Sequence, residues 1–339
     1  MIKVKLSIGD TKPRPTLSEY FNNNDKNEVF FDTSRECKDA DFWFIIDNLN
    51  EDDSECVVAS NRIFWFDTET MFPAGHYFTR GLPNFLSQFA RNYTFEEIPT
   101  ANKFHSPPFL PWMINNKEPT VASSFQGNLR DHEYFKTSTF NKKSILLSAI
   151  CSTKSYTEDH KIRLRFIEKL STDLKEDFLW VGNGKSKIDD KFEITSQSKY
   201  QLVIENKIMH DVFSEKIYDA FLGESFPIYA GAPNIGKYFN DRSILSINLR
   251  DYSKSLDAIK QRISKNLTNI ELESLKQNKN IVLDELNLIK RLYEIALKSN
   301  SIEGTPKHNK LFPKKYFLDK KISRHIYSSF GKYVKHKLS

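Results

Sequence analysis

The chain has 339 residues, which is long enough for two domains of ordinary size. Hydrophobic residues make up 39% of it and charged residues 28%, a balance that supports a packed core and excludes a largely disordered protein. The formal net charge is +6, and three irregularly spaced cysteines (Cys37, Cys56 and Cys151) exclude a disulfide framework and favour reduced thiols in the cytoplasm.

The N-terminal part, residues 1–116, predicts alternating strands and helices. Short runs that fit strands are residues 2–8, 41–46 and 62–66. Residues 82–93 fit a helix, because apolar rings recur there at every fourth position. The Pro-rich segment 104–112 is expected to be an extended loop. This part therefore predicts a first Rossmann-like domain.

A polar segment without periodicity, residues 117–143, is expected to link this domain to a second one at residues 144–252. In the second domain, strand-like runs at 144–150, 178–181, 200–205 and 227–230 are interleaved with helical patterns at 162–170 and 214–222. The order strand–helix–strand predicts parallel, right-handed crossovers. Two such α/β units predict two Rossmann-like domains that face a cleft.

The last segment, residues 253–339, predicts a helical extension with a basic tail. From Gly304 onward, ten lysine and arginine residues are opposed only by Asp319, a net charge of +9. Such a tail fits a polyanionic surface, either lipid headgroups or nucleic acid, and fits a solvated helix face equally well. No apolar run reaches the roughly 18–20 residues that span a bilayer. The N-terminus does not resemble a signal peptide, so we expect any membrane contact to be peripheral.

Polar residues gather after one strand and at the start of the next helix. The strand at 200–205 ends in Glu205 and Asn206, and the following helix begins with Ser214, Glu215 and Lys216. Ligands of open α/β sheets lie beyond the carboxyl ends of strands, near helix N-termini, so we expect these side chains around one site. Ser214 fits an N-cap, the lysine suits phosphate, and a carboxylate suits ribose hydroxyls. From spacing alone, an ordinary surface pair explains Glu215 and Lys216 as well or better.

The same stretch resembles the donor-binding signature of the glycosyltransferase family 10 α-1,3-fucosyltransferases, in their bacterial form. The matching residues, in the family's order, are Ile204-Glu205-Asn206, Ser214-Glu215-Lys216, Ala220-Phe221, Pro227-Ile228-Tyr229, Gly231, Pro233-Asn234-Ile235 and Tyr238-Phe239. Ser214 replaces a threonine and Ile204 a phenylalanine. Val212 stands where the family has an aromatic residue, which leaves a different donor sugar open.

Two further segments resemble the family. Arg163 begins the 162–170 helix where the family has an arginine that contacts the diphosphate, and Arg165 is its nearest rival. Residues 64–73 are similar to the segment that carries the catalytic base, and the matching carboxylate is Glu69, with Asp67 as its nearest rival.

The resemblance implies a GT-B architecture and transfer of fucose from GDP-fucose to a hydroxyl of a glycan acceptor, with inversion. Inversion implies a single displacement in which Glu69 is the base, while Arg163 and Lys216 stabilise the departing GDP. It implies no cofactor and no metal, so Asp67-Thr68-Glu69 is not interpreted as a metal site. A lipid-linked acceptor would suit a basic tail that docks on the inner face of a membrane.

Three alternatives stay open. The chain could be a transferase of the same fold that uses another nucleotide sugar, a non-catalytic glycan-binding relative, or a nucleic-acid-binding protein that uses its basic tail. No nucleic-acid-binding motif is present, so nucleic acid is not the expected partner. Acceptor-binding residues are not predicted.

Overall fold

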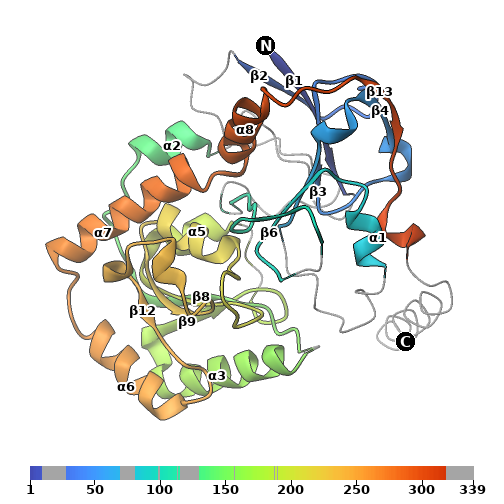
Figure 1. Ribbon diagram of the computed structural model, residues 1–339. Coiled ribbons are helices and arrows are strands. Elements are labelled where there is room, and N and C mark those ends of the chain that lie inside the picture. Colours follow the sequence, from blue (N-terminus) through green and yellow to red (C-terminus); the bar gives the residue numbers. More distant parts are fainter. Residues whose placement is uncertain are drawn as a thin grey trace. The chain divides into compact units, whose positions relative to one another are not determined.

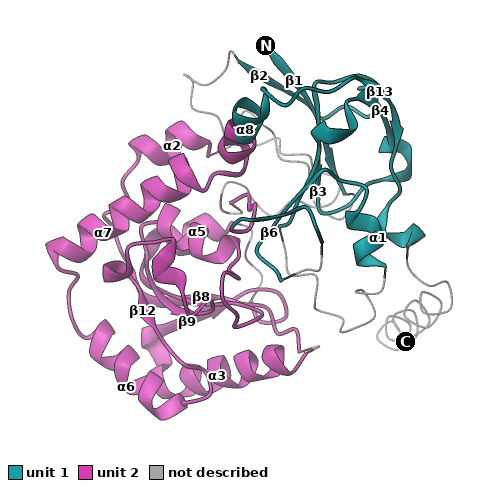
Figure 2. Ribbon diagram, viewed as in Figure 1, with its two compact units in different colours: residues 1–12, 27–106, 295–339 teal, residues 13–26, 107–294 magenta. Residues whose placement is uncertain are grey.

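The protein divides into two compact units, each built on its own parallel sheet (Figure 2). A computed structural model describes residues 1–9, 28–68, 81–97, 100–112, 114, 130–155, 157–186, 188 and 190–317. Unit 1 comprises residues 1–12, 27–106 and 295–339, and unit 2 comprises residues 13–26 and 107–294. The predicted α/β class with two Rossmann-like units is confirmed.

Six parallel strands form the sheet of unit 1, in the order β2-β1-β3-β5-β6-β7. They are β1 (Ile2–Ile8), β2 (Val29–Asp32), β3 (Phe42–Ile46), β5 (Ile63–Phe66), β6 (Arg91–Thr94) and β7 (Lys103–His105). Strands β3 and β5 are apolar and buried at every position, as expected for central strands covered on both faces. Trp43 and Trp65 pack with the short helix α1 (Leu82–Leu86) in one core cluster.

The helix predicted for residues 82–93 is wrong beyond Leu86. The chain turns after α1 and continues as β6, which pairs with β5. Asn92 on β6 is buried, and its side-chain amide donates to the carbonyl oxygen of Leu86 at 3.2 Å. Phe85 and Phe89 are both buried in the core, so the apolar spacing is satisfied by one helical turn followed by a tight turn.

The described end of the chain returns to unit 1. Strand β13 (Lys307–Lys310) pairs antiparallel with β4 (Glu55–Val58), and Phe317 packs against Phe85 with ring centroids 6.2 Å apart. The segment expected as a single helical extension, residues 253–339, is thus divided between the two units. The division falls within α8 (Leu288–Ser299).

Five parallel strands form the sheet of unit 2, in the order β12-β11-β10-β8-β9. They are β8 (Ile145–Ile150), β9 (Phe178–Val181), β10 (Ser198–Ile204), β11 (Phe226–Ala230) and β12 (Leu245–Ser246). The chain runs from β8 to β9 on one side and from β10 to β11 and β12 on the other, so the strand order reverses between β8 and β10. Right-handed crossovers therefore place α3 (Glu158–Leu174) and α5 (Glu215–Leu222) on opposite faces of the sheet (Figure 1).

The other helices of unit 2 are α2 (His132–Thr137), α4 (Lys191–Gln197), α6 (Tyr252–Ile263) and α7 (Asn269–Asn280). Helix α2 lies inside the segment expected to be a link, where Asp131 caps it by accepting from the backbone N–H of Tyr134 at 2.8 Å. The helical extension expected from residue 253 is interrupted after α7. A π-helical turn (Ile281–Glu285) precedes α8, and Asn287 starts α8 by accepting from the backbone N–H groups of Ile289 and Lys290.

The Pro-rich segment predicted as an extended loop contains neither helix nor strand at residues 106–112. The guanidinium of Arg291 holds it, donating to the carbonyl oxygens of Pro107 at 2.8 Å and Pro108 at 2.6 Å. None of the helices described here is both long and apolar enough to cross a membrane.

Candidate functional site

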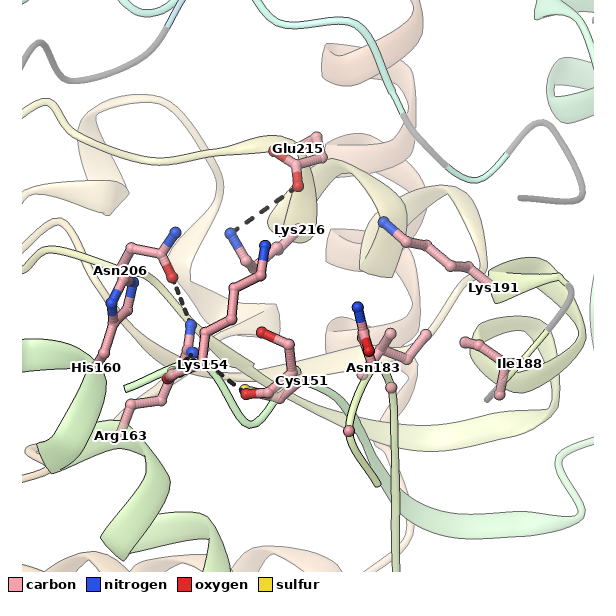
Figure 3. A pocket seen from close by; sticks show the side chains of 14 residues that line it. Cys151, Lys154, His160, Arg163, Asn183, Ile188, Lys191, Asn206, Glu215 and Lys216 are labelled. Atoms are coloured by element: carbon pink, nitrogen blue, oxygen red, sulfur yellow. Dashed lines mark hydrogen bonds and ion pairs between the residues drawn. The ribbon is translucent and has the colours of Figure 1, made fainter. Parts of the chain in front are cut away.

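A cavity of about 520 Å³ opens at the carboxyl ends of β8, β9 and β10 in unit 2 (Figure 3). It lies where the strand order reverses, which is the position at which open α/β sheets bind ligands. The charged residues that line it are Lys154, Arg163, Lys191, Lys216 and Glu215. Four cations against one carboxylate make the cavity suitable for an anion.

Arg163 lies in the second turn of α3 and is only 4% exposed. One terminal nitrogen donates to Asn206 Oδ1, and the other donates to the carbonyl oxygens of Ser152 at 3.3 Å and Lys154 at 3.2 Å. Its Nε–H has no acceptor within the described residues. The guanidinium is therefore fixed in place with one donor unused, and a buried donor without a partner costs about 1–3 kcal/mol.

The structure brings Arg163, rather than Arg165, to the cavity. The Arg165 side chain is 66% exposed, and its Nη2 pairs with Glu158 at 2.8 Å. It contributes to a separate shallow groove beside Tyr252. Asn206 follows β10 and both lines the cavity and accepts from Arg163, so these two predicted residues act as one pair.

Lys216 reaches the cavity from the first turn of α5 and is held by the buried Glu205 and the half-buried Ser214. Ser214 caps the helix, with its Oγ 3.5 Å from the backbone nitrogen of Lys216. The carboxylate of Glu205 accepts from Ser214 N at 2.9 Å and from Ser214 Oγ at 2.6 Å. The Lys216 ammonium donates to Ser214 Oγ at 2.8 Å and lies 3.4 Å from Glu205 Oε2.

Glu205 and Ser214, which were predicted around the ligand, are thus not among the residues that line the cavity. They form a support that fixes Lys216. Glu215 does line the cavity, and its Oε1 lies 3.9 Å from the Lys216 ammonium. Burial alone would lower the pKa of Lys216, but the carboxylates of Glu215 and Glu205 outweigh burial and raise it. The ammonium therefore stays charged at neutral pH.

Residues of the sequence signature that follow β11 hold the loop between β10 and α5 in place. Asp211 has a positive φ of 61°, accepts from the Asn234 side-chain amide at 2.7 Å and accepts from the Tyr238 hydroxyl. A Cβ added to Gly231 would lie 2.1 Å from the Tyr229 hydroxyl, so this position needs glycine. Val212 is buried and does not line the cavity, so the lost aromatic residue belongs to this loop's packing.

Among the lining residues that the sequence analysis missed are three with polar side chains, Lys154, Asn183 and Lys191. Asn183 lies in the turn after β9 between Gly182 and Gly184, whose φ angles are 130° and 84°. Lys191 is the first residue of α4. A usable signal was present, because a Gly-Asn-Gly turn directly after an apolar strand places bare backbone at the ligand-binding edge of a sheet.

The predicted base, Glu69, lies outside the described residues, but its rival Asp67 is described. Asp67 follows β5 in unit 1, is 1% exposed, and accepts from Thr94 Oγ1 at 2.7 Å. Burial, together with the carboxylates of Asp47 and Glu96, raises the pKa of Asp67 well above its ordinary value. A raised pKa favours the protonated form of Asp67, which cannot accept a proton, so Glu69 stays the preferred prediction.

Within the described ranges, no three or more His, Cys, Asp or Glu side chains gather closely enough to hold a metal ion. His160, which lines the cavity, accepts at Nδ1 from the backbone N–H of Thr157 in a capping box. Burial and the charge of Arg163 lower the pKa of His160, so it is neutral at neutral pH.

The chain is similar in part to known proteins. No protein-family model matches it. A segment of 74 residues is 34% identical to the α-(1,3)-fucosyltransferase FucT of Helicobacter pylori, and this segment spans 22% of the chain and 16% of that protein's length.

Two solved structures of α1,3-fucosyltransferase are similar at a lower level. One has a TM-score of 0.48 and 17% identity, with 88% of this chain and 89% of that chain covered. The other, with GDP-fucose, has a TM-score of 0.43 and 15% identity, with 94% of this chain and 88% of that chain covered. Scores below 0.5 do not establish a common fold, so the fold rests on the two sheets described above. The shared segment confirms the predicted resemblance for that part of the chain, which is similar to an α-1,3-fucosyltransferase.

Proposed function

We propose that this chain is a glycosyltransferase that transfers fucose from GDP-fucose to a hydroxyl group of a glycan acceptor, with inversion at the anomeric carbon. The observation that carries this proposal is the cationic cavity at the strand reversal of unit 2, where Arg163 donates to Asn206 and Lys216 donates to Ser214. A nucleoside diphosphate carries several negative charges, and fixed cations at helix N-termini bind it without reorganising.

In this mechanism, the two cations stabilise the charge that develops on the departing diphosphate. Arg163 has a buried Nε–H for which the described residues provide no acceptor, and a phosphate oxygen would supply one. Lys216 is charged and rigid because Glu205 and Ser214 hold it. Glu215 offers a carboxylate that suits the hydroxyl groups of a ribose.

The acceptor hydroxyl needs a base, and we assign that role to Glu69 by its sequence context. It follows β5, so it comes after the carboxyl end of a central strand of unit 1. In-line attack by the deprotonated hydroxyl, through an oxocarbenium-like transition state, gives inversion in one step. We further propose a cytoplasmic location, with the basic tail on the inner face of the membrane and a lipid-linked glycan as the acceptor.

A ligand panel tests the donor class. Because a ligand that binds the native state raises its melting temperature, GDP should stabilise the protein and UDP should not. GDP-fucose should then be consumed in the presence of glycan acceptors. Equal or greater stabilisation by UDP would overturn the donor class. Consumption of another nucleotide sugar in place of GDP-fucose would favour the related transferase that the valine at position 212 leaves open.

A further inference from the structure

The cavity of unit 2 extends across three neighbouring strand ends. Asn206 follows β10, Cys151 follows β8 and Gly182 follows β9, and these strands are adjacent in the sheet. Two strand spacings amount to about 10 Å. In Figure 3, Arg163 and Asn206 lie at one end, whereas Asn183, Ile188 and Lys191 lie at the other. The cavity is therefore elongated, with different side chains at its two ends.

The β10 end suits the phosphates. Arg163 is bonded there to Asn206, and its Nε–H lacks an acceptor within the described ranges. Lys216, held by Ser214, lies between the two ends in the same view. With the diphosphate bound by these two cations, the rest of a nucleotide has room to lie toward β9.

The β9 end presents bare backbone and one apolar side chain. The turn after β9 is closed by a hydrogen bond from Gly182 N to Ser186 O at 2.9 Å, and Thr153 N donates to Asn183 O at 3.0 Å. A Cβ at Gly182 would lie 2.7 Å from the carbonyl oxygen of Cys151, so a larger residue does not fit. A rigid turn without side chains at its glycines, together with Ile188, offers a surface against which a flat ring can stack.

Lys191 supplies the hydrogen-bond donors at this end. It lies at the first position of α4, and its ammonium is 3.7 Å from Asp219 Oδ2, longer than a normal hydrogen bond. Its side chain is 32% exposed, so the ammonium can turn toward a ligand. Guanine presents two adjacent acceptors, O6 and N7, to such a donor, whereas adenine replaces O6 with an amino group.

We propose that the nucleobase of the donor binds at the Asn183–Lys191 end of the cavity, and that Lys191 selects guanine by donating to O6 and N7. This inference rests on the proposed function, because it takes the ligand to be a GDP-sugar. It identifies a specificity-determining residue that neither the sequence signature nor the diphosphate contacts include.

The test compares GDP and ADP affinities, by calorimetry, in wild-type protein and in Lys191→Met. Methionine keeps much of the stem and removes the donors. A lost guanine contact of this kind corresponds to about a tenfold or larger fall in the ratio of GDP to ADP affinity. Lys191→Arg keeps donors and should keep the preference. Lys185→Met is the matched control, because Lys185 lies in the turn after β9, six residues before Lys191, and its ammonium packs over the Trp180 ring at 4.7 Å.

The outcomes separate this inference from the proposed function. An equal loss of GDP and ADP affinity in Lys191→Met would make Lys191 a phosphate contact and overturn its role in base selection. Unchanged GDP affinity would remove it from the site. A wild-type protein that binds UDP more tightly than GDP would overturn the donor class itself, and this inference with it. Melting temperatures without ligand show whether each variant is folded.

Discussion

At the scale of single residues, the proposed donor binding depends on two cations, Arg163 and Lys216, which are positioned by hydrogen bonds to Asn206 and Ser214. We expect Arg163→Ala and Lys216→Ala each to weaken GDP binding, because each removes a charged hydrogen-bond donor from the cavity. Such a bond contributes about 1.5–3 kcal/mol, which corresponds to roughly a tenfold to hundredfold loss of affinity. Titration calorimetry with GDP measures it.

Arg165→Ala is the control for this prediction, because Arg165 is exposed and pairs with Glu158 outside the cavity. Its GDP affinity should match that of the wild-type protein. An unchanged affinity in Arg163→Ala together with a loss in Arg165→Ala would reverse the assignment.

Asp67 should make the stability of the protein depend on pH. Its folded-state pKa is raised by burial and by Asp47 and Glu96, so the folded state holds a proton that the unfolded chain releases near pH 4. The stabilisation is complete below that pH and is lost as pH rises through the folded pKa. The Asp67→Asn side chain cannot ionise. The melting temperature of the variant, minus that of the wild-type protein, should therefore increase between pH 4 and pH 8. A constant difference over this range would show that Asp67 titrates normally.

Glu69→Gln should abolish transfer and leave GDP binding intact, because the change removes the proton acceptor and hardly alters the size of the side chain. General-base catalysis commonly contributes 10²–10⁴-fold, so the loss should be plain in a transfer assay. Asp67→Asn is measured beside it and should retain transfer, since burial raises the pKa of Asp67 and so favours the form that cannot accept a proton. A selective loss of transfer in Asp67→Asn would move the role of base to that residue.

At the scale of elements, the turn after β11 packs closely against Glu205, the carboxylate that positions Lys216. Gly231→Ala would place a Cβ 2.1 Å from the Tyr229 hydroxyl and 2.6 Å from Glu205 Cγ. Overpacking of this kind costs about 1–3 kcal/mol, and here it also pushes on the carboxylate that fixes Ser214 and Lys216. We therefore expect lower thermal stability and weaker GDP binding.

Gly236→Ala is the matched control for this element. It lies five residues along the same loop, and its added Cβ would meet nothing closer than 3.7 Å. It should leave both properties nearly unchanged. Equal effects in the two glycine variants would show that the close approach at Gly231 is not what matters.

An element could be predicted from the sequence when its own residues carry the signal that defines it. Strands β3, β5 and β8 were predicted, because central strands of a parallel sheet are continuous apolar runs. Strands β4 and β13 were missed, since they are short, carry charged residues and are defined only by pairing with each other across the chain. Helix α5 and its cap were predicted because Ser214 carries a local signal.

The candidate site, too, could be predicted only as far as its residues carry a local signal. Residues in the signature were predicted together, and the structure brings Arg163, Asn206, Glu215 and Lys216 to one cavity. The sequence could not separate the residues that line it from those that support it, because Glu205 differs from Glu215 only in tertiary burial. Nor did it point to Lys191, whose place depends on a helix from a different crossover.

At the scale of the whole molecule, both sheets follow one plan. Each sheet is parallel, and in each the strand order reverses beside the first strand of the sheet. The reversal lies between β1 and β3 in unit 1 and between β8 and β10 in unit 2. Each therefore offers a binding position at its own carboxyl edge. Unit 2 uses this edge for an anion cavity, and unit 1 bears the carboxylates of Asp47, Asp67 and Glu96 after β3, β5 and β6. We therefore propose unit 2 as the donor-binding unit and unit 1 as the acceptor-binding unit.

The last prediction concerns the basic tail, which we propose as a peripheral membrane anchor. Four of its ten basic residues are described, and Lys310 and Lys315 pair with Glu55 at 2.9 Å and Glu51 at 2.6 Å. Phe317 packs on the core of unit 1. Residues up to 317 are therefore part of unit 1, and a truncation must spare them. The other six basic residues, Lys320, Lys321, Arg324, Lys332, Lys335 and Lys337, lie beyond this point, outside the described residues.

A chain that stops after Phe317 should keep its melting temperature and its GDP affinity but lose binding to anionic vesicles. Each basic residue near an anionic surface contributes about 1 kcal/mol, so the loss should be large at low salt and smaller at high salt. Sedimentation with phosphatidylserine-containing vesicles and with neutral vesicles measures it for both chains. Equal sedimentation of the full-length and truncated chains would rule out the anchor. A truncated chain that also melts early would indicate that the tail packs on the protein instead.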